Sequence, residues 1–304
     1  MPQRVAALVK EWFAGRIETF ALSGDRSVYI PFEDGDHTHI KIKGAGYRGQ
    51  EVRFGTYLKA GPASLLFDYD GRRMVDVAHG HDGAFVGGAS MQQAVTEWRM
   101  SATLPELGYQ VVPCPGFGTV SDGTRTSWFS VFRWHEDWID TAKPPHSTAL
   151  EYEALTRNAS RDVLDLATRH NLVGFFWRIR TQDKTELMKD LHPARRMDPM
   201  NYSQISWVMQ VCHAMHITSI STHLLATKWF GKEVGRMAGL WMIWPYFPQA
   251  TLEDWDDLRF SVVSAYMKRE PERFRPETLV SVLEANPIAA RLMELCPPEY
   301  ERFR

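Results

Sequence analysis

Hydrophobic and polar residues follow two different periods along this 304-residue chain. Before Pro144-Pro145 they alternate in short runs, which is typical of β-strands. After these prolines the hydrophobic residues recur at helical spacing. The first part predicts strands over 27–32, 37–42, 111–120 and 127–134, and helices over 1–20 and 89–107, the latter ending before Gly108. The second part predicts helices over 151–169, 203–228, 252–268 and 276–284.

This order of elements predicts the fold class. Strands that precede helices favour an α+β architecture with two lobes. We expect a β-rich N-terminal lobe over residues 1–143, with one helix beside its sheet, and a helical C-terminal lobe over residues 144–304. A cleft between two such lobes is a common place for a ligand site.

Charge and composition exclude several classes of protein. Lysine and arginine number 35 and aspartate and glutamate 37, so the formal net charge is −2, and we expect neither a nucleic-acid nor a membrane partner. No apolar run approaches the ~18 residues that cross a bilayer, and the first helix has too many charges for a secretory signal. Three cysteines do not form a disulfide framework, so we expect a cytoplasmic protein.

Four residues of the first part follow the layout of a protein-kinase small lobe. Gly24 and Arg26 lie in a turn, Lys43 ends the second expected strand, and Glu97 lies on the helix. Backbone amides of such a turn approach phosphates closely because glycine has no Cβ. The lysine then contacts the phosphates, and the glutamate holds the lysine in place. The alternative is that Lys43 is a solvated strand residue and Glu97 a surface charge of the helix.

Several short motifs, in matching order, resemble the selenoprotein O family, whose members are protein-kinase-like enzymes that transfer AMP to hydroxyl side chains. The motifs are Ile42–Gly46, Asp82-Gly83, Thr96–Trp98 followed by Leu107-Gly108, Phe132-Arg133 and Ala167–His170. The similarity is distant and discontinuous. It implies a bilobal protein-kinase-like fold, ATP as the bound cofactor, and nucleotidyl or phosphoryl transfer if the chain is an active enzyme.

The resemblance also implies roles for individual residues. The residues expected in catalysis are Lys43, Glu97 and His213. The residues expected around the nucleotide are Gly24, Arg26, Lys43, Asp82, Gly83 and Arg133, of which Arg133 would contact a phosphate.

The family pattern fails where its catalytic base and its metal ligands should stand. The matching stretch is Cys212–Ile220, with Ser219 at the position of the base and Ile220 at that of a metal-binding Asn. Trp229 stands at the position of the second metal-binding Asp. Isoleucine and tryptophan have no oxygen ligand for Mg²⁺. If the chain is aligned with the family pattern in this way, ordinary metal-dependent nucleotidyl or phosphoryl transfer is lost. We therefore assign no metal ligand and leave the use of Mg²⁺ open.

Two replacements for the missing groups follow from the sequence. In another register, an acidic residue such as Asp190 or Asp198 takes their place. Alternatively, the cluster of His213, His216 and Ser219 performs new chemistry on a small molecule, since a neutral imidazole can act as a general base near pH 7.

We therefore expect a nucleotide-binding, kinase-fold protein that resembles the AMP transferases but has altered metal and base residues. The alternatives are a catalytically inactive pseudokinase that serves as a binding or scaffold module, and a kinase-fold enzyme repurposed for small-molecule modification. The acceptor, a protein hydroxyl or a small molecule, is unknown. Lys43 and Glu97 should meet at salt-bridge distance, and as a partly exposed pair they should contribute ~0–1 kcal/mol to stability.

Overall fold

The computed structural model describes most of the chain in two compact units. The described residues are 1–14, 16–17, 27–44, 89–121, 126–140, 148–174, 176–197, 204–241, 243, 246–258, 281 and 283–303. One unit comprises Met1–Ile139 and Ile179–Pro193, and the other comprises Asp140–Arg178 and Ala194–Arg304. The sequence placed a single boundary between residues 143 and 144. The return of residues 179–193 to the first unit depends on tertiary packing, which chain order does not reveal.

The first unit is built on an antiparallel sheet of four strands. These strands are β1 (Ser27–Asp34), β2 (His37–Lys43), β3 (Gly116–Ser121) and β4 (Thr126–Trp134). They are ordered β1-β2-β4-β3, so β2 and β4 are the central pair. Gly35 adopts a positive φ of 61° in the turn between β1 and β2, a conformation that glycine adopts without strain. The expected strands over 27–32, 37–42 and 127–134 are confirmed.

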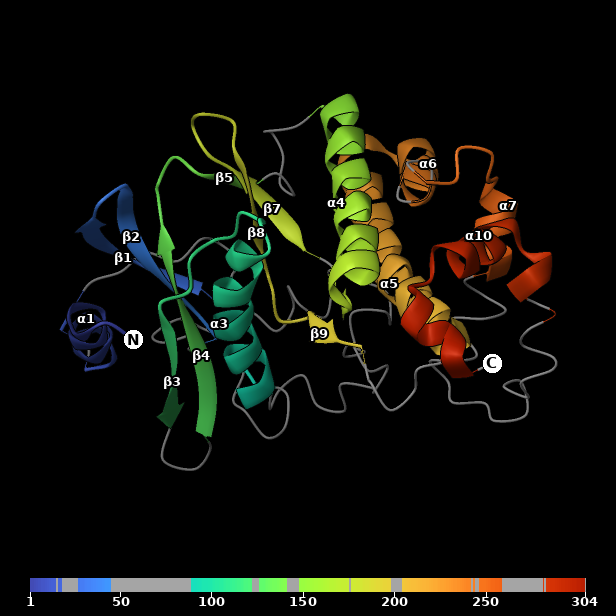
Figure 1. The fold of residues 1–304 in the computed structure, drawn as a ribbon. Coiled ribbons are helices and arrows are strands. Elements are labelled where there is room, and N and C mark those ends of the chain that lie inside the picture. The colour runs from blue at the N-terminus through green and yellow to red at the C-terminus, as the bar shows by residue number, and fades with distance from the viewer. Residues whose placement is uncertain are drawn as a thin grey trace. The chain divides into compact units, whose positions relative to one another are not determined.

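The two faces of this sheet have different chemistry. Residues paired directly across an antiparallel ladder share a face, and neighbours along a strand alternate between faces. Ile40, Ile42 and Val131 therefore share one face, which packs against α1 (Gln3–Phe13). Lys41 and Lys43 belong to the other face, the side on which α3 (Met91–Glu106) lies. Figure 1 shows α1 and α3 on opposite sides of the sheet.

Local signals define both ends of α3. Ser90 and Gln93 form a reciprocal capping box at its N-terminus. Beyond its C-terminus Gly108 has a φ of 91°, which is the left-handed position that commonly ends a helix. The expected stop at Gly108 is confirmed.

The segment after α3 brings a distant part of the chain into the first unit. The amide of Met188 donates to the carbonyl of Gln110 at 2.9 Å, and the amide of Val112 donates to the carbonyl of Met188, also at 2.9 Å. Met188 belongs to a three-stranded sheet in the order β5-β7-β8, formed by β5 (Ile139–Asp140), β7 (Trp177–Arg180) and β8 (Glu186–Lys189). The residues after β8 therefore lie beside α3.

The second unit is mostly helical. Its helices are α4 (Ala149–His170), α5 (Gln204–Phe230), α6 (Lys232–Trp241), α7 (Leu252–Asp257), α10 (Pro287–Leu295) and the 3-10 helix η6 (Pro298–Phe303). A short ribbon pairs β6 (Leu172–Val173) with β9 (Arg195–Arg196). With the β-rich first unit, this confirms the predicted α+β class. Among the described helices, none is long and apolar enough to span a membrane.

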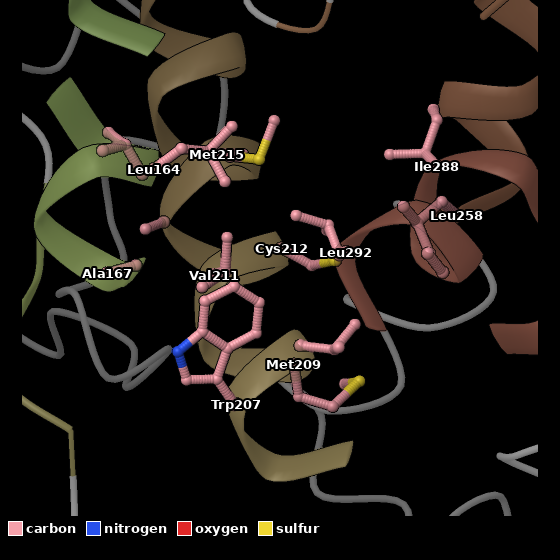
Figure 2. Packing of buried hydrophobic residues seen from close by; sticks show 14 of the residues in the cluster. Leu164, Ala167, Trp207, Met209, Val211, Cys212, Met215, Leu258, Ile288 and Leu292 are labelled. Atoms are coloured by element: carbon pink, nitrogen blue, oxygen red, sulfur yellow. The ribbon is translucent and has the colours of Figure 1, made fainter. Parts of the chain in front are cut away.

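Helix α5 forms the centre of the core of this unit. It is 27 residues long, and hydrophobic side chains occupy all of its sides, as expected for a helix surrounded by other elements. Figure 2 shows Trp207, Val211 and Met215 on α5, with Leu164 of α4 on one side and Leu292 of α10 on the other. The expected helix over 203–228 is thus confirmed.

Candidate functional site

The site of the first unit is centred on an ion pair between β2 and α3. The Lys43 ammonium donates to Glu97 Oε1 at 2.8 Å, although 54 positions separate the two residues. Glu97 projects from the buried stripe of α3, which also contains Ala94, Met100 and Leu104. The predicted meeting of Lys43 and Glu97 is confirmed.

Glu97 also holds a second segment, the one that follows β8. Its Oε2 accepts a hydrogen bond from the backbone amide of Leu191 at 2.8 Å. Its Oε1 lies 3.2 Å from Nδ1 of His192. One buried carboxylate therefore orients both the lysine and the backbone that follows Asp190.

Asp190 completes the cluster. Its Oδ1 accepts a hydrogen bond from the Lys43 ammonium, and its Oδ2 lies 3.6 Å from Nζ of Lys189. The backbone of Asp190 has a φ of 58°, in the left-handed region. Aspartate tolerates this region better than most residues, but the conformation still stores strain, which is common at functional sites. We call Lys43, Glu97, Asp190 and His192 the charged cluster.

The neighbouring cations keep both acids ionised. Burial opposes ionisation of Glu97, but Lys43 and then His192 outweigh burial and lower its pKa to about 2. Burial likewise opposes ionisation of Asp190, and Lys43, Lys189 and Lys41 together hold its pKa well below its ordinary value. The carboxylates of Glu97 and Asp190 are thus both ionised at neutral pH.

Burial corrects the expected energetics of the pair. The Glu97 side chain is 2% exposed and that of Lys43 12%, so the pair is not partly exposed as the sequence suggested. Removing one partner of a buried pair leaves the other charge uncompensated, which typically costs ~3–5 kcal/mol. The earlier figure of ~0–1 kcal/mol holds only for pairs in water.

Arg133 lies away from the charged cluster. It pairs with Ile40 across the β2–β4 ladder, so its side chain leaves the sheet on the α1 face, opposite to that of Lys43. Its guanidinium forms an ion pair with Asp34 at 2.8 Å. The structure therefore does not bring Arg133 to Lys43, and its role as a phosphate contact stays a prediction without geometric support. Gly24, Arg26, Asp82 and Gly83, also expected around the nucleotide, lie outside the described residues.

His213 lies in the second unit, in the middle of α5, and is 2% exposed. Burial, with the Arg195 charge as a smaller cause, lowers its pKa to about 4, so the ring is neutral at pH 7. Ser219, placed by the family pattern at the position of the base, is also buried on α5 and accepts a hydrogen bond from Trp255 at 3.2 Å. The catalytic role of His213 stays a prediction.

The structure shows where the stretch aligned with the family's base and metal ligands lies. Cys212–Ile220, which the sequence aligned with the segment that contains the base and a metal ligand, is a continuous part of helix α5. Asp190, one of the two acids that the sequence offered as a replacement, contacts Lys43. Two signals in the sequence point to this arrangement: an acid directly after a short strand, and Glu97 at a core position of an amphipathic helix. His192 has no comparable signal.

No protein-family model and no curated protein matches this chain. Among solved structures, a MAP kinase from Leishmania major aligns over 98% of this chain and 92% of its own, with 12% sequence identity and a TM-score of 0.33. We draw no conclusion from a TM-score this low. The α+β class follows from the elements of the structure itself.

Proposed function

We propose that this chain is a kinase-like protein that binds a nucleoside triphosphate through the charged cluster. The observation that supports the proposal is the contact of Lys43 with both Glu97 and Asp190. Protein kinases use a lysine at a strand, a glutamate on a helix and an aspartate after a later strand for phosphate and metal binding. The three residues here occur in the same chain order and on the same kinds of element.

Each residue would have a separate task. Lys43 would contact a phosphate, in competition with Asp190 for the same ammonium. Glu97 would hold Lys43 and the amide of Leu191 in place through the hydrogen bonds that it makes to both. Side chains held in this way lose less conformational entropy when phosphates bind, which lowers the cost of binding.

Mg²⁺ fits this site as a partner of the phosphates. Asp190 offers one carboxylate at a strand end, and Mg²⁺ in nucleotide sites commonly takes one or two carboxylates together with phosphate oxygens and water. Over the described ranges, no group of three or more His, Cys, Asp and Glu side chains could hold a metal. When bound, the ion would neutralise phosphate charge, while Asp190 would hold it on the side of Lys43.

A second observation favours binding without efficient transfer. In kinases a catalytic loop with an aspartate base precedes the metal-binding aspartate. Here the stretch 171–189 before Asp190 contains two acids, Asp183 and Glu186. The Asp183 carboxylate accepts hydrogen bonds from Thr181 and Thr185 in the turn between β7 and β8. We therefore favour the pseudokinase form of the proposal, and AMP transfer is its alternative.

Thermal unfolding with ATP, with and without Mg²⁺, tests the binding. A ligand of the folded state raises the melting temperature, by an amount that grows with its concentration above Kd. We expect a rise with ATP that Mg²⁺ increases, loss of the rise in Lys43→Ala, and loss of the Mg²⁺ increment alone in Asp190→Asn. Arg133→Ala is the matched control and should bind as the wild type does, because Arg133 lies on the other sheet face.

Two results would contradict the proposal. The first is a melting temperature that ATP, ADP and AMP all leave unchanged at millimolar concentration. The second is equal binding by wild type and Lys43→Ala. Turnover separates the two forms of the proposal: incubation with labelled ATP that yields a labelled product, lost in Lys43→Ala, would reject the pseudokinase in favour of a transferase.

A further inference from the structure

The face of the sheet next to Lys43 is filled by side chains of the protein. Lys41 is the next residue of β2 on that face, and it is paired with Tyr29 on β1 and Phe132 on β4. Trp134 is the following residue of β4 on the same face. All four are at most 9% exposed.

Lys41 occupies this face in a specific way. Its ammonium lies 4.6 Å from the centre of the Trp134 ring and 5.5 Å from that of Tyr29. Contacts of a cation with aromatic faces at this range are attractive, more so when water is excluded. The stem of Lys41 therefore covers the sheet while its charge is stabilised by the two rings.

A second layer closes the face from above. Ile179 of β7 is fully buried in a hydrophobic cluster with Tyr29, Phe132 and Trp134, and Leu187 of β8 packs against the same cluster. The exposed part of the site is instead the charged cluster, where the side chains of Asp190 and His192 are 25% and 28% exposed. Among these described residues, the packed side chains therefore leave no room for a flat ring against this face of the sheet. The exposed charged groups lie next to this face, in the charged cluster.

We infer that the ligand held at Lys43 is recognised through its phosphates and not through a base, because Lys41, Tyr29 and Trp134 occupy the sheet face on which a base would stack. This inference rests on the proposed function and narrows its substrate class to triphosphates irrespective of the group attached. Lys41 is the specificity-determining residue, since its ammonium lies against both rings, which also contact each other edge to face with their centroids 5.7 Å apart.

Calorimetric titration with the magnesium salts of ATP, GTP, CTP and methyl triphosphate tests the inference, since these four ligands share their phosphates and differ in the attached group. We expect four dissociation constants within about threefold of one another, a spread of less than one kcal/mol. A constant for ATP more than about tenfold below that for methyl triphosphate would overturn the inference and leave the proposed function intact. Failure of all four ligands to bind would overturn both.

Two variants of Lys41 sharpen the test. Lys41→Ala removes the stem and opens the space beside Tyr29 and Trp134, so we expect nucleotides to gain affinity over methyl triphosphate. Lys41→Met keeps an unbranched side chain in the space without the charge, and should stay indifferent to the base. A base preference in Lys41→Met equal to that in Lys41→Ala would contradict the assignment. If Lys41→Ala does not fold, as judged by circular dichroism, the titration of the wild type with the four triphosphates alone tests the inference.

Discussion

Glu97 of the charged cluster and the polar residues Thr218 and Thr222 of α5 are all buried, yet their hydrogen bonds are made in different ways. Glu97 takes its partners from β2 and from the segment after β8, far away in the sequence. On α5, Thr218 donates to the carbonyl of Ala214 at 2.8 Å, and Thr222 donates to the carbonyl of Thr218 at 2.7 Å. Such local bonds need no tertiary partner. Buried polar residues whose partners are distant are therefore the better candidates for a site.

The largest expected effect comes from removing the carboxylate at the centre of the cluster. Glu97→Ala leaves the Lys43 ammonium and the Leu191 amide without that carboxylate, so we expect the free energy of unfolding to fall by ~3–5 kcal/mol. Urea unfolding measures this change. Glu106→Ala, an exposed acid on the same helix, is the control and should change stability by less than ~0.5 kcal/mol.

A double-mutant cycle tests whether the loss belongs to the pair. Lys43→Ala and Glu97→Ala should combine less than additively, with a coupling of ~0.5–3 kcal/mol, because either single change already breaks the contact. Additive losses would mean that the contact itself contributes nothing, and would remove the energetic basis of the cluster.

The two regions should also lose stability in different pH ranges. The pKa of His213 falls from 6.5 to about 4 in the folded chain, and that of Glu97 falls from 4.5 to about 2. In each case the unfolded chain binds the proton first, so stability is complete above the unfolded pKa and lost as pH falls through the folded one. A shift of this size corresponds to about 3 kcal/mol for each group.

Denaturant unfolding as a function of pH separates the two contributions. We expect His213→Gln to remove the loss between pH 6.5 and about 4, and Glu97→Gln to remove the loss between pH 4.5 and about 2. If the stability of either variant still depended on pH as the wild type does within the range assigned to that residue, the loss of stability in that range would not come from that residue.

The smallest effect concerns the backbone of Asp190. Asp190→Asn and Asp190→Ala both remove the carboxylate that contacts Lys43, but the two residues differ in how well they accept a φ of 58°. We expect Asp190→Asn to be more stable than Asp190→Ala by about 1 kcal/mol, since Asn tolerates the left-handed region and Ala does not. Equal thermal stability of the two variants would show that the strain at this position is negligible.

Much of the fold could be predicted because it depends on local patterns. Alternation of side chains predicted β1, β2 and β4, and helical spacing predicted α3 and α5. The pairing of Lys43 with Glu97 could also be anticipated, since a lysine at a strand end and a glutamate on the next helix form a layout with a known physical purpose.

The remaining features depend on distances that no local pattern encodes. The sequence placed the base and metal positions within Cys212–Ile220, at Ser219 and Ile220, and left open whether Asp190 or Asp198 replaces them; that stretch forms part of the core helix α5. Asp190 reaches Lys43 because β8 pairs with the segment after α3. One of the backbone hydrogen bonds in this pairing joins Gln110 and Met188, which are 78 positions apart in the sequence (188 − 110).

The sequence by itself therefore determined the α+β class and most of the elements, because periodicity and helix signals act over a few residues. It could only suggest the Lys43–Glu97 pair, from the kinase-like layout. Tertiary structure alone decided which acid joins the pair, which face Arg133 takes and how deeply Glu97 is buried. The physical reason is that burial and ion pairing are set by what packs around a residue, and those neighbours come from segments whose approach is governed by the whole fold.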